Sequence, residues 1–282
     1  MRDRPHWSYS AINQYLRCPL QYFFQRVLGL PSRTTASGLI LGSAVHAALA
    51  HYHRRLQLKE EIQANGVLET FRETWADRET HENIVFKDGD TRDDSIGQGV
   101  QLLETYLKQP PPTGIVAVEQ EILAPLYNSH GEYLENPLLA ITDLIKVEDG
   151  TLTVNEFKTS GRAYSESDVT TSLQPTCYGH AVHETYGKEA AIEYTILVKT
   201  KTPKVQRLKT ARTPKDFARL GDLVQTVEKA VNVGVFYPVE NAMNCSGCSF
   251  RHQCREWGTR PAREEALVEI QLPAEAVACS QN

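Results

Sequence analysis

The chain has 282 residues, of which 41% are hydrophobic and 23% charged, as in an ordinary globular protein with a sizeable core. A formal net charge of -5 argues against a protein that coats nucleic acid through bulk positive charge. No stretch has the apolar length of a membrane span. Residues 1–7 lack the apolar core of a signal peptide, so we expect a cytoplasmic protein whose six cysteines serve a purpose other than disulfides.

The first third of the chain predicts two helices and a loop. Ser8 or Ser10 can cap a helix that Pro19 interrupts, and Ser43 can cap a second helix from about residue 44 to 58. The segment 87–99 is rich in Asp and Gly, which is typical of an exposed loop.

From residue 115 onward the pattern of apolar residues changes from helical to alternating. Strands are predicted near 115–123, 138–148, 151–158 and 192–199. Helical pattern returns after Pro175 and over 214–233. Helices before, between and after a short sheet predict a mixed α/β fold, with a mixed central sheet flanked by helices.

The most informative stretch runs from Leu139 to Lys158, because Asp149-Gly150 is a strong hairpin signal between two alternating segments. If the two residues form the turn, the antiparallel register places Asp143 directly opposite Glu156. Both side chains then leave the same apolar face, with Cβ atoms roughly 5 Å apart.

Two facing carboxylates on an apolar face repel one another and need a neutralising partner. A bound divalent cation is one such partner, and Lys158 shares the face with Glu156, two residues away. The alternative is a structural salt bridge from Lys158 to one of the acids, which leaves the other acid uncompensated.

An Asp followed by Glu-x-Lys at the end of the next strand resembles the active site of the PD-(D/E)XK nucleases. Further motifs resemble the RecB-like branch of that family. The segment Gly42-Ser-Ala-Val-His46 looks like its histidine motif, and Gln174-x-x-x-Tyr178 looks like its Gln-x-x-x-Tyr motif. Pro175 is at home only in a first helical turn, so Gln174 is expected to cap a helix.

The resemblance implies a restriction-endonuclease-like core and a Mg²⁺- or Mn²⁺-dependent deoxyribonuclease, and within that class it favours an exonuclease acting on single-stranded DNA. Asp143 and Glu156 would hold the metal, with His46 and the Phe157 carbonyl as further ligands, and Lys158 would be catalytic. Gln174 and Tyr178 would contact the substrate. A place in DNA repair or CRISPR adaptation is implied, with a helicase or CRISPR-adaptation protein as partner, since the sequence has no Gly-x-x-x-x-Gly-Lys loop.

Four cysteines form a second pattern. Cys245, Cys248 and Cys254 are closely spaced, and Cys18 stands in the context Arg-Cys-Pro near the other end of the chain. Four thiolates can hold either a [4Fe-4S] cluster or a tetrahedral Zn²⁺. One early and three late cysteines resemble the iron-sulfur branch of the RecB-like nucleases, including AddB-type nuclease domains and the stand-alone nucleases of CRISPR adaptation, which favours the cluster.

The resemblance also implies a domain organisation. A single nuclease domain is expected over residues 1–264, with its catalytic core at 115–200 and an iron-sulfur lobe formed by 8–30 and 240–258. The tail 265–282 has no predicted structure. Cys177 and Cys279 are expected to be an apolar filler and a free thiol.

Seven basic residues and no acidic ones lie between Lys199 and Lys215. Such a strip could follow a phosphate backbone, with Lys204, Arg207 and Lys209 as DNA contacts, or it could be a solvated hairpin surface. Two other functions stay open at this point. One is a non-catalytic DNA-binding or assembly subunit that keeps the fold and the cluster, and the other is a zinc-stapled structural protein with ion-paired carboxylates.

Overall fold

The protein is described by a computed structural model over residues 6–87 and 89–257. These residues form two compact units. The sheet unit contains the described residues up to Tyr9 together with 34–226, and the cysteine unit contains 10–33 and the described residues from 227 on. None of the helices in the described part of the chain is both long and apolar enough to cross a membrane.

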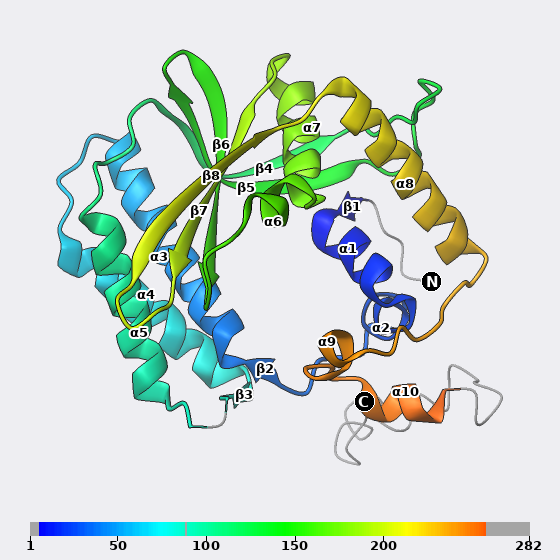
Figure 1. Ribbon diagram of the computed structural model, residues 1–282, viewed down its shortest axis with the longest axis horizontal. Coiled ribbons are helices and arrows are strands. Elements are labelled where there is room, and N and C mark those ends of the chain that lie inside the picture. Colours follow the sequence, from blue (N-terminus) through cyan, green and yellow to red (C-terminus); the bar gives the residue numbers. More distant parts are fainter. Residues whose placement is uncertain (1–5, 88, 258–282) are drawn as a thin grey trace, which may run out of the picture. The chain divides into compact units, whose positions relative to one another are not determined.

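A mixed six-stranded sheet forms the centre of the sheet unit, in the order β1-β5-β6-β7-β8 with β4 also paired to β5 (Figure 1). The β6–β7 and β1–β5 pairs are parallel and the others are antiparallel. The strands are β1 (Trp7–Ser8), β4 (Ile115–Ala124), β5 (Leu138–Glu148), β6 (Thr151–Ser160), β7 (Ala191–Val198) and β8 (Lys204–Ala211). A mixed α/β fold with a central mixed sheet flanked by helices was predicted and is confirmed.

The turn between β5 and β6 fixes the register that the sequence predicts. Asp149 and Gly150 both have positive φ, 48° and 76°, as a tight two-residue hairpin turn requires. The ladder runs from Glu148↔Thr151 to Leu144↔Asn155. Continued by one residue, it brings Asp143 level with Glu156, so the predicted register is confirmed.

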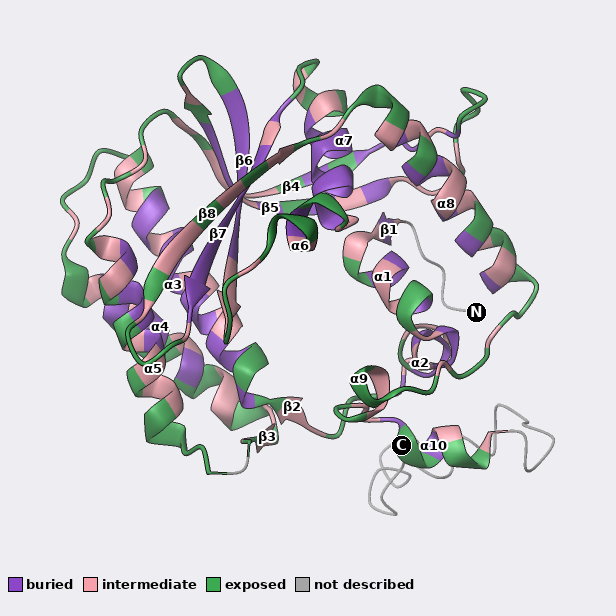
Figure 2. Cartoon of the chain, viewed as in Figure 1, coloured by how far each residue is buried: buried purple, intermediate pink, exposed green. Residues whose placement is uncertain are grey.

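Helices cover both faces of the sheet. On one face α3 (Ser37–Gln57), α4 (Ala64–His81) and α5 (Arg92–Leu107) pack around Trp75, Leu144 and Phe157. On the other face α7 (Gln174–Tyr186) packs against Ile145 and neighbouring apolar side chains of β6 and β7. Figure 2 shows buried residues along the strands and on the helix surfaces that contact them. The remaining elements of this unit are β2 (Thr35–Ala36), β3 (Ile84–Val85), α6 (Glu166–Thr170) and most of α8 (Pro214–Asn232).

Two local predictions were wrong, and one helix was missed. The helix expected from residue 44 begins at Ser37, and α4 was not predicted. The segment 87–99, expected to be a loop, contains the first half of α5. Its start is fixed by Thr91 and Asp94, whose side chains each accept the other residue's backbone N–H. This reciprocal cap satisfies two N–H groups that the first helical turn leaves free, so it offsets the poor helix propensity of the Asp- and Gly-rich segment.

The cysteine unit is built around an aromatic core. Phe23, Phe24, Phe250 and Trp257 pack edge-on or tilted, with ring centroids 5.4 to 5.9 Å apart in the contacting pairs. Three of the predicted cluster cysteines, at 18, 248 and 254, pack against this core. The elements are α1 (Tyr9–Arg17, from Ser10 on), α2 (Pro19–Tyr22), the π-helix η1 (Phe23–Val27), α9 (Ala242–Cys245) and α10 (Arg251–Glu256). The tail 265–282 and Cys279 lie outside the described residues.

Two glycines of α5 give a matched test of this packing. A Cβ at Gly99 would lie 2.1 Å from the Phe71 ring, whereas a Cβ at Gly97 would meet nothing within 4 Å. Gly99→Ala should therefore destabilise the protein by about 1 to 3 kcal/mol, because the ring must shift within a packed core. Gly97→Ala should stabilise it by about 0.5 to 1 kcal/mol through helix propensity. Thermal and urea unfolding measure both, and equal effects would contradict the described α4–α5 contact.

Candidate functional site

The β5–β6 ladder ends where the two predicted acids begin. Leu144↔Asn155 is its last pair. Beyond it, Oδ2 of Asp143 accepts the backbone N–H of Phe157 at 2.7 Å. A side chain thus replaces the next ladder bond, and the strands separate around two carboxylates.

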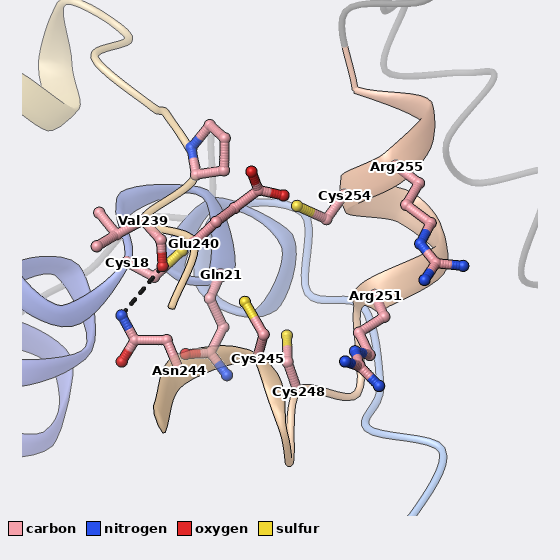
Figure 3. A pocket seen from close by; sticks show the side chains of 11 residues that line it. Cys18, Gln21, Val239, Glu240, Asn244, Cys245, Cys248, Arg251, Cys254 and Arg255 are labelled. Atoms are coloured by element: carbon pink, nitrogen blue, oxygen red, sulfur yellow. Dashed lines mark hydrogen bonds between the residues drawn. The ribbon is translucent and has the colours of Figure 1, made fainter. Parts of the chain in front are cut away.

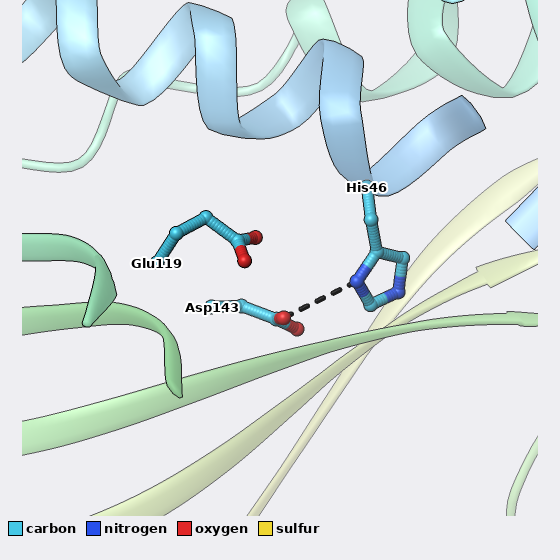
Figure 4. Close-up of side chains that lie close together, drawn as sticks. All are labelled: His46, Glu119 and Asp143. Atoms are coloured by element: carbon cyan, nitrogen blue, oxygen red, sulfur yellow. Dashed lines mark hydrogen bonds and ion pairs between the residues drawn. The ribbon is translucent and has the colours of Figure 1, made fainter. Parts of the chain in front are cut away.

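Three potential metal ligands meet at this point, on three different elements. Nδ1 of His46 in α3 lies 3.2 Å from Oδ1 of Asp143, and Glu119 approaches both from β4 (Figure 4). One ligand atom from each of the three lies within 4.8 Å of the other two. The predicted proximity of His46 and Asp143 is present, whereas Glu119 was not predicted as a site residue.

Glu119 reaches this position through a local distortion of its strand. Its φ is 51°, a left-handed conformation that non-glycine residues rarely adopt. The pairs Val118↔Leu144 and Gln120↔Thr142 are formed, but Glu119 and Asp143 between them are not a ladder pair. Backbone strain of this kind concentrates at functional sites. An acidic residue within a strand was visible in the sequence, but nothing there indicated the distortion.

Glu156 is held by a different set of partners. Its Oε1 accepts hydrogen bonds from Nζ of Lys158 at 2.6 Å and Nε2 of Gln174 at 2.8 Å. Gln174 also accepts from Lys158 at 2.9 Å and donates to the Tyr178 hydroxyl at 2.8 Å. Gln174 is the first residue of α7, next to Pro175, whereas the cap position expected for it is occupied by Leu173. Gln174 and Tyr178 are both buried, and in this structure they position the Glu156–Lys158 pair.

Glu156 does not belong to the close group formed by His46, Asp143 and Glu119. Instead its second oxygen, Oε2, is buried and accepts no hydrogen bond from any residue that the structure describes. A buried carboxylate oxygen without a partner is costly. The open acceptor on Glu156 fits a site that binds a cation. Carboxylates with an imidazole form a donor set suited to a divalent ion.

The protonation states reflect the same crowding of charge. Burial, followed by the charge of Asp143, raises the pKa of Glu156 to about 7. Burial would lower the pKa of His46, but the hydrogen bond and charge of Asp143 outweigh it and raise this pKa to about 9. Without a metal, a proton on His46 therefore neutralises Asp143, and Lys158 neutralises Glu156.

The Phe157 side chain fixes the position of β6. Its ring is buried and stacks on His53, with centroids 5.2 Å apart and planes at 16°. His53 is in turn hydrogen-bonded to the Tyr106 hydroxyl at 2.9 Å. These contacts fix the backbone between Glu156 and Lys158, so they hold in place the Phe157 carbonyl that the sequence suggests as a ligand.

The basic strip of the sequence is divided between the two faces of β8, because neighbouring side chains of a strand alternate. Arg207 and Lys209 face Glu193 of β7, at 3.9 and 3.5 Å, and Lys209 also pairs with Glu148 at 2.7 Å. Lys204 occupies the opposite parity. The three predicted DNA contacts therefore do not form one continuous surface.

The four predicted cluster cysteines line one cavity of the cysteine unit, with a volume of about 140 Å³ (Figure 3). Cys18 approaches from the N-terminal segment and Cys245, Cys248 and Cys254 from α9, α10 and the turn between them. Asn244 joins the two segments by donating to the Arg17 carbonyl at 2.9 Å. No three of these described sulfurs lie within 4.8 Å of one another. Cys177 is buried in α7, which belongs to the sheet unit.

A model of the PD-(D/E)XK nuclease superfamily matches residues 6–255. Among solved structures, one titled "Putative exonuclease" from Eubacterium rectale is similar over 99% of this chain and 94% of its own, with a TM-score of 0.54 and 13% identity. A second, SSO0001, covers 83% of this chain and 93% of its own at a TM-score of 0.36 and 14% identity. No curated protein matches the chain.

The pKa values of Glu156 and His46 predict that metal binding releases protons. A divalent ion needs Glu156 ionised and His46 neutral, so binding at pH 6 must displace protons from both, and affinity should rise with pH between about 6 and 9. Calorimetric titration with Mn²⁺ in two buffers of different ionisation enthalpy measures the release.

A matched pair of histidines controls this experiment. His81 also pairs with an aspartate, Asp77, but on an exposed surface of α4. His46→Gln should lower both the affinity and the number of protons released, whereas His81→Gln should match the wild type. Binding that is independent of pH, or equally affected by both substitutions, would remove His46 from the metal centre.

Proposed function

From the membership of this chain in the PD-(D/E)XK nuclease superfamily, we propose that it is a Mg²⁺- or Mn²⁺-dependent deoxyribonuclease that digests single-stranded DNA from an end. The single observation that carries the proposal is the half-buried group of His46, Asp143 and Glu119, together with the buried Oε2 of Glu156, which accepts no hydrogen bond from the described residues. Fold and family imply a nuclease, and these side chains supply the acidic donors that such a nuclease needs.

Each residue has a distinct proposed role. Asp143 and Glu156 would hold the ion, with His46, Glu119 and the Phe157 carbonyl as further ligands. A divalent ion in this position activates water and stabilises negative charge on the phosphate. Lys158 is held by Glu156 and Gln174, so its ammonium is pre-oriented to stabilise the same charge without reorganisation during the reaction.

The strongest rival is a subunit that keeps the fold but has lost catalysis. The set of Asp143, Glu156 and Lys158 argues against it, because the full burial of Glu156 beside the half-buried Asp143 and Lys158 costs stability and gains nothing unless these groups perform chemistry. The buried pair Lys146–Glu193 is an example of a structural ion pair in the same sheet. The Glu193 carboxylate is neutralised by three basic side chains, those of Lys146, Arg207 and Lys209.

Substitution of the three central residues tests the assignment. Asp143→Asn and Glu156→Gln should reduce metal-dependent cleavage to background, and Lys158→Ala should reduce it by about 10² to 10³. Glu156→Gln should fold as well as the wild type, because burial raises the pKa of Glu156 and the substitution removes a buried negative charge. Asp143→Asn removes the charged partner of His46, so its cleavage is compared per folded molecule. Glu193→Gln, which changes a buried glutamate of the neighbouring strand, should keep its activity per folded molecule.

The substrate is tested with end-labelled linear single strands, the matching duplex and a circular single strand, each with Mg²⁺, Mn²⁺ or a chelator. We expect metal-dependent loss of the linear strand and resistance of the circle. Cleavage of the circle would make the enzyme an endonuclease, and cleavage retained in Asp143→Asn or Glu156→Gln would refute the proposed site.

We further propose that Cys18, Cys245, Cys248 and Cys254 hold a [4Fe-4S] cluster. Four thiols around one cavity beside an apolar aromatic core support this proposal. Zinc is the alternative, but Zn–S bonds of about 2.3 Å in a tetrahedron would bring all sulfurs within about 3.8 Å of one another. A [4Fe-4S] cluster holds its four thiolates farther apart than a single zinc ion does, so the iron, sulfide and zinc content of the protein distinguishes the two groups.

The cluster would connect two segments that are more than two hundred residues apart in the sequence. Cys18→Ala should therefore release the iron and destabilise the cysteine unit by about 4 to 5 kcal/mol if closure of a long loop sets the scale. Cys177→Ala, a buried cysteine outside the cavity, is the control. Iron and sulfide analysis of anaerobically purified protein checks both, and a colourless protein that contains zinc would refute the cluster.

A further inference from the structure

A groove with a volume of about 670 Å³ opens from the metal centre along α3. The helix contributes eight lining residues, and all belong to two neighbouring rows spaced four residues apart, so they form one continuous strip of the helix surface. One row is Gly38, Gly42, His46, Ala50 and Arg54, and the other is Leu39, Ser43 and Ala47. Glu119, Lys158 and Thr159 line the opposite side.

Two glycines on the wall of this α3 groove are not required by packing within the protein. A Cβ at Gly38 would meet nothing within 4 Å, and one at Gly42 would meet only Oγ1 of Thr159 at an ordinary 3.5 Å. Glycine weakens a helix interior relative to alanine. Both glycines thus leave open space beside α3, because no other part of the described protein packs there. This space continues to His46, Glu119 and Lys158.

The two ends of the α3 groove differ in chemistry. Leu39 is 67% exposed at one end, and the exposed guanidinium of Arg54 lies at the other. Fifteen residues separate them, about 22 Å along a helix. This is the length of roughly six stacked nucleotides at about 3.4 Å each. His46 lies near the middle, so a strand in the groove would pass the metal centre.

We propose that a single DNA strand lies along α3, with Leu39 against a nucleobase and Arg54 against a backbone phosphate on the other side of the cleavage point. This inference rests on the proposed nuclease function and specifies its substrate. An apolar side chain can contact a base face only where the base is not covered by a stacked neighbour, which favours an unpaired strand over an intact duplex. Arg54 and Lys158 supply the positive charge that successive phosphates need.

The helices of the protein offer a matched control for each contact. Leu58 is 66% exposed at the far end of α3 but outside the groove, and Arg55 pairs with Glu60 on another side of the same helix. Gly97 in α5 is an open helix glycine remote from the groove. The test variants Leu39→Ala, Arg54→Ala and Gly38→Ala are therefore compared with Leu58→Ala, Arg55→Ala and Gly97→Ala.

Binding is measured by fluorescence anisotropy of a labelled single strand and its duplex over a range of salt, with Ca²⁺ in place of the catalytic metal. Arg54→Ala should lower the slope of log affinity against log salt by about 0.7, the value for one phosphate contact on a single strand. Leu39→Ala should weaken single-strand binding about fivefold to tenfold and leave duplex binding nearly unchanged. Gly38→Ala, in the first turn of α3, should leave the melting temperature nearly unchanged or slightly raised, yet weaken single-strand binding.

The outcomes separate the two levels of the proposal. A wild-type protein that neither binds nor cleaves DNA with any divalent metal refutes the proposed function itself. A wild-type protein that cleaves DNA, while the three groove variants behave like their controls, leaves that function intact and overturns the path along α3. An equal loss of single-strand and duplex binding in Leu39→Ala would overturn the contact with an unpaired base.

Discussion

The burial of Asp143 and Glu156 at one point in the sheet is the constraint on which the site depends. Both carboxylates lie where β5 and β6 separate, in a setting where like charges repel strongly. Without a metal the protein compensates by pairing each acid with its own cation, His46 for Asp143 and Lys158 for Glu156. A metal would replace the proton on His46 and bring the two halves of the site together.

Comparison with a neighbouring pair shows why this compensation is incomplete. Glu193 of β7 is also buried, but Lys146, Arg207 and Lys209 all lie within 4 Å of its carboxylate. Glu156 accepts hydrogen bonds from Lys158 and Gln174 on one oxygen, and no described residue donates to the other. The charge of Glu193 is fully compensated by protein side chains, so this first arrangement is structural. The second keeps an open acceptor, which is a feature of sites that bind a ligand.

The sequence predicted the parts of this site that depend on short-range rules. The Asp149-Gly150 turn determines the hairpin register, and Pro175 places Gln174 at the start of α7. The prediction that both acids leave one common face of the hairpin does not describe their contacts. Asp143 is hydrogen-bonded to His46 of α3, whereas Glu156 accepts from Gln174 of α7. Alternation describes a regular strand, and here the strands part.

Other features could not be read from the chain because they arise from tertiary structure. Glu119 enters the site only through a positive φ that its residue type does not favour. The hairpin face that carries Thr142, Lys146 and Asn155 is polar in sequence yet buried. Hydrogen bonds between these side chains and Gln120, Glu193 and Thr195 on the neighbouring strands offset part of that burial. The four cysteines, by contrast, were recognisable as a set, and the structure places them around one cavity.

The most direct test of the account is anomalous diffraction from crystals of the full chain grown with Mn²⁺. The account predicts one strong peak in contact with Asp143, Glu156 and His46, with Glu156 rotated or shifted so that its Oε2 binds the ion. A peak at another place, or an ordered site in which Lys158 still neutralises Glu156 at saturating Mn²⁺ and no peak is present, would contradict it.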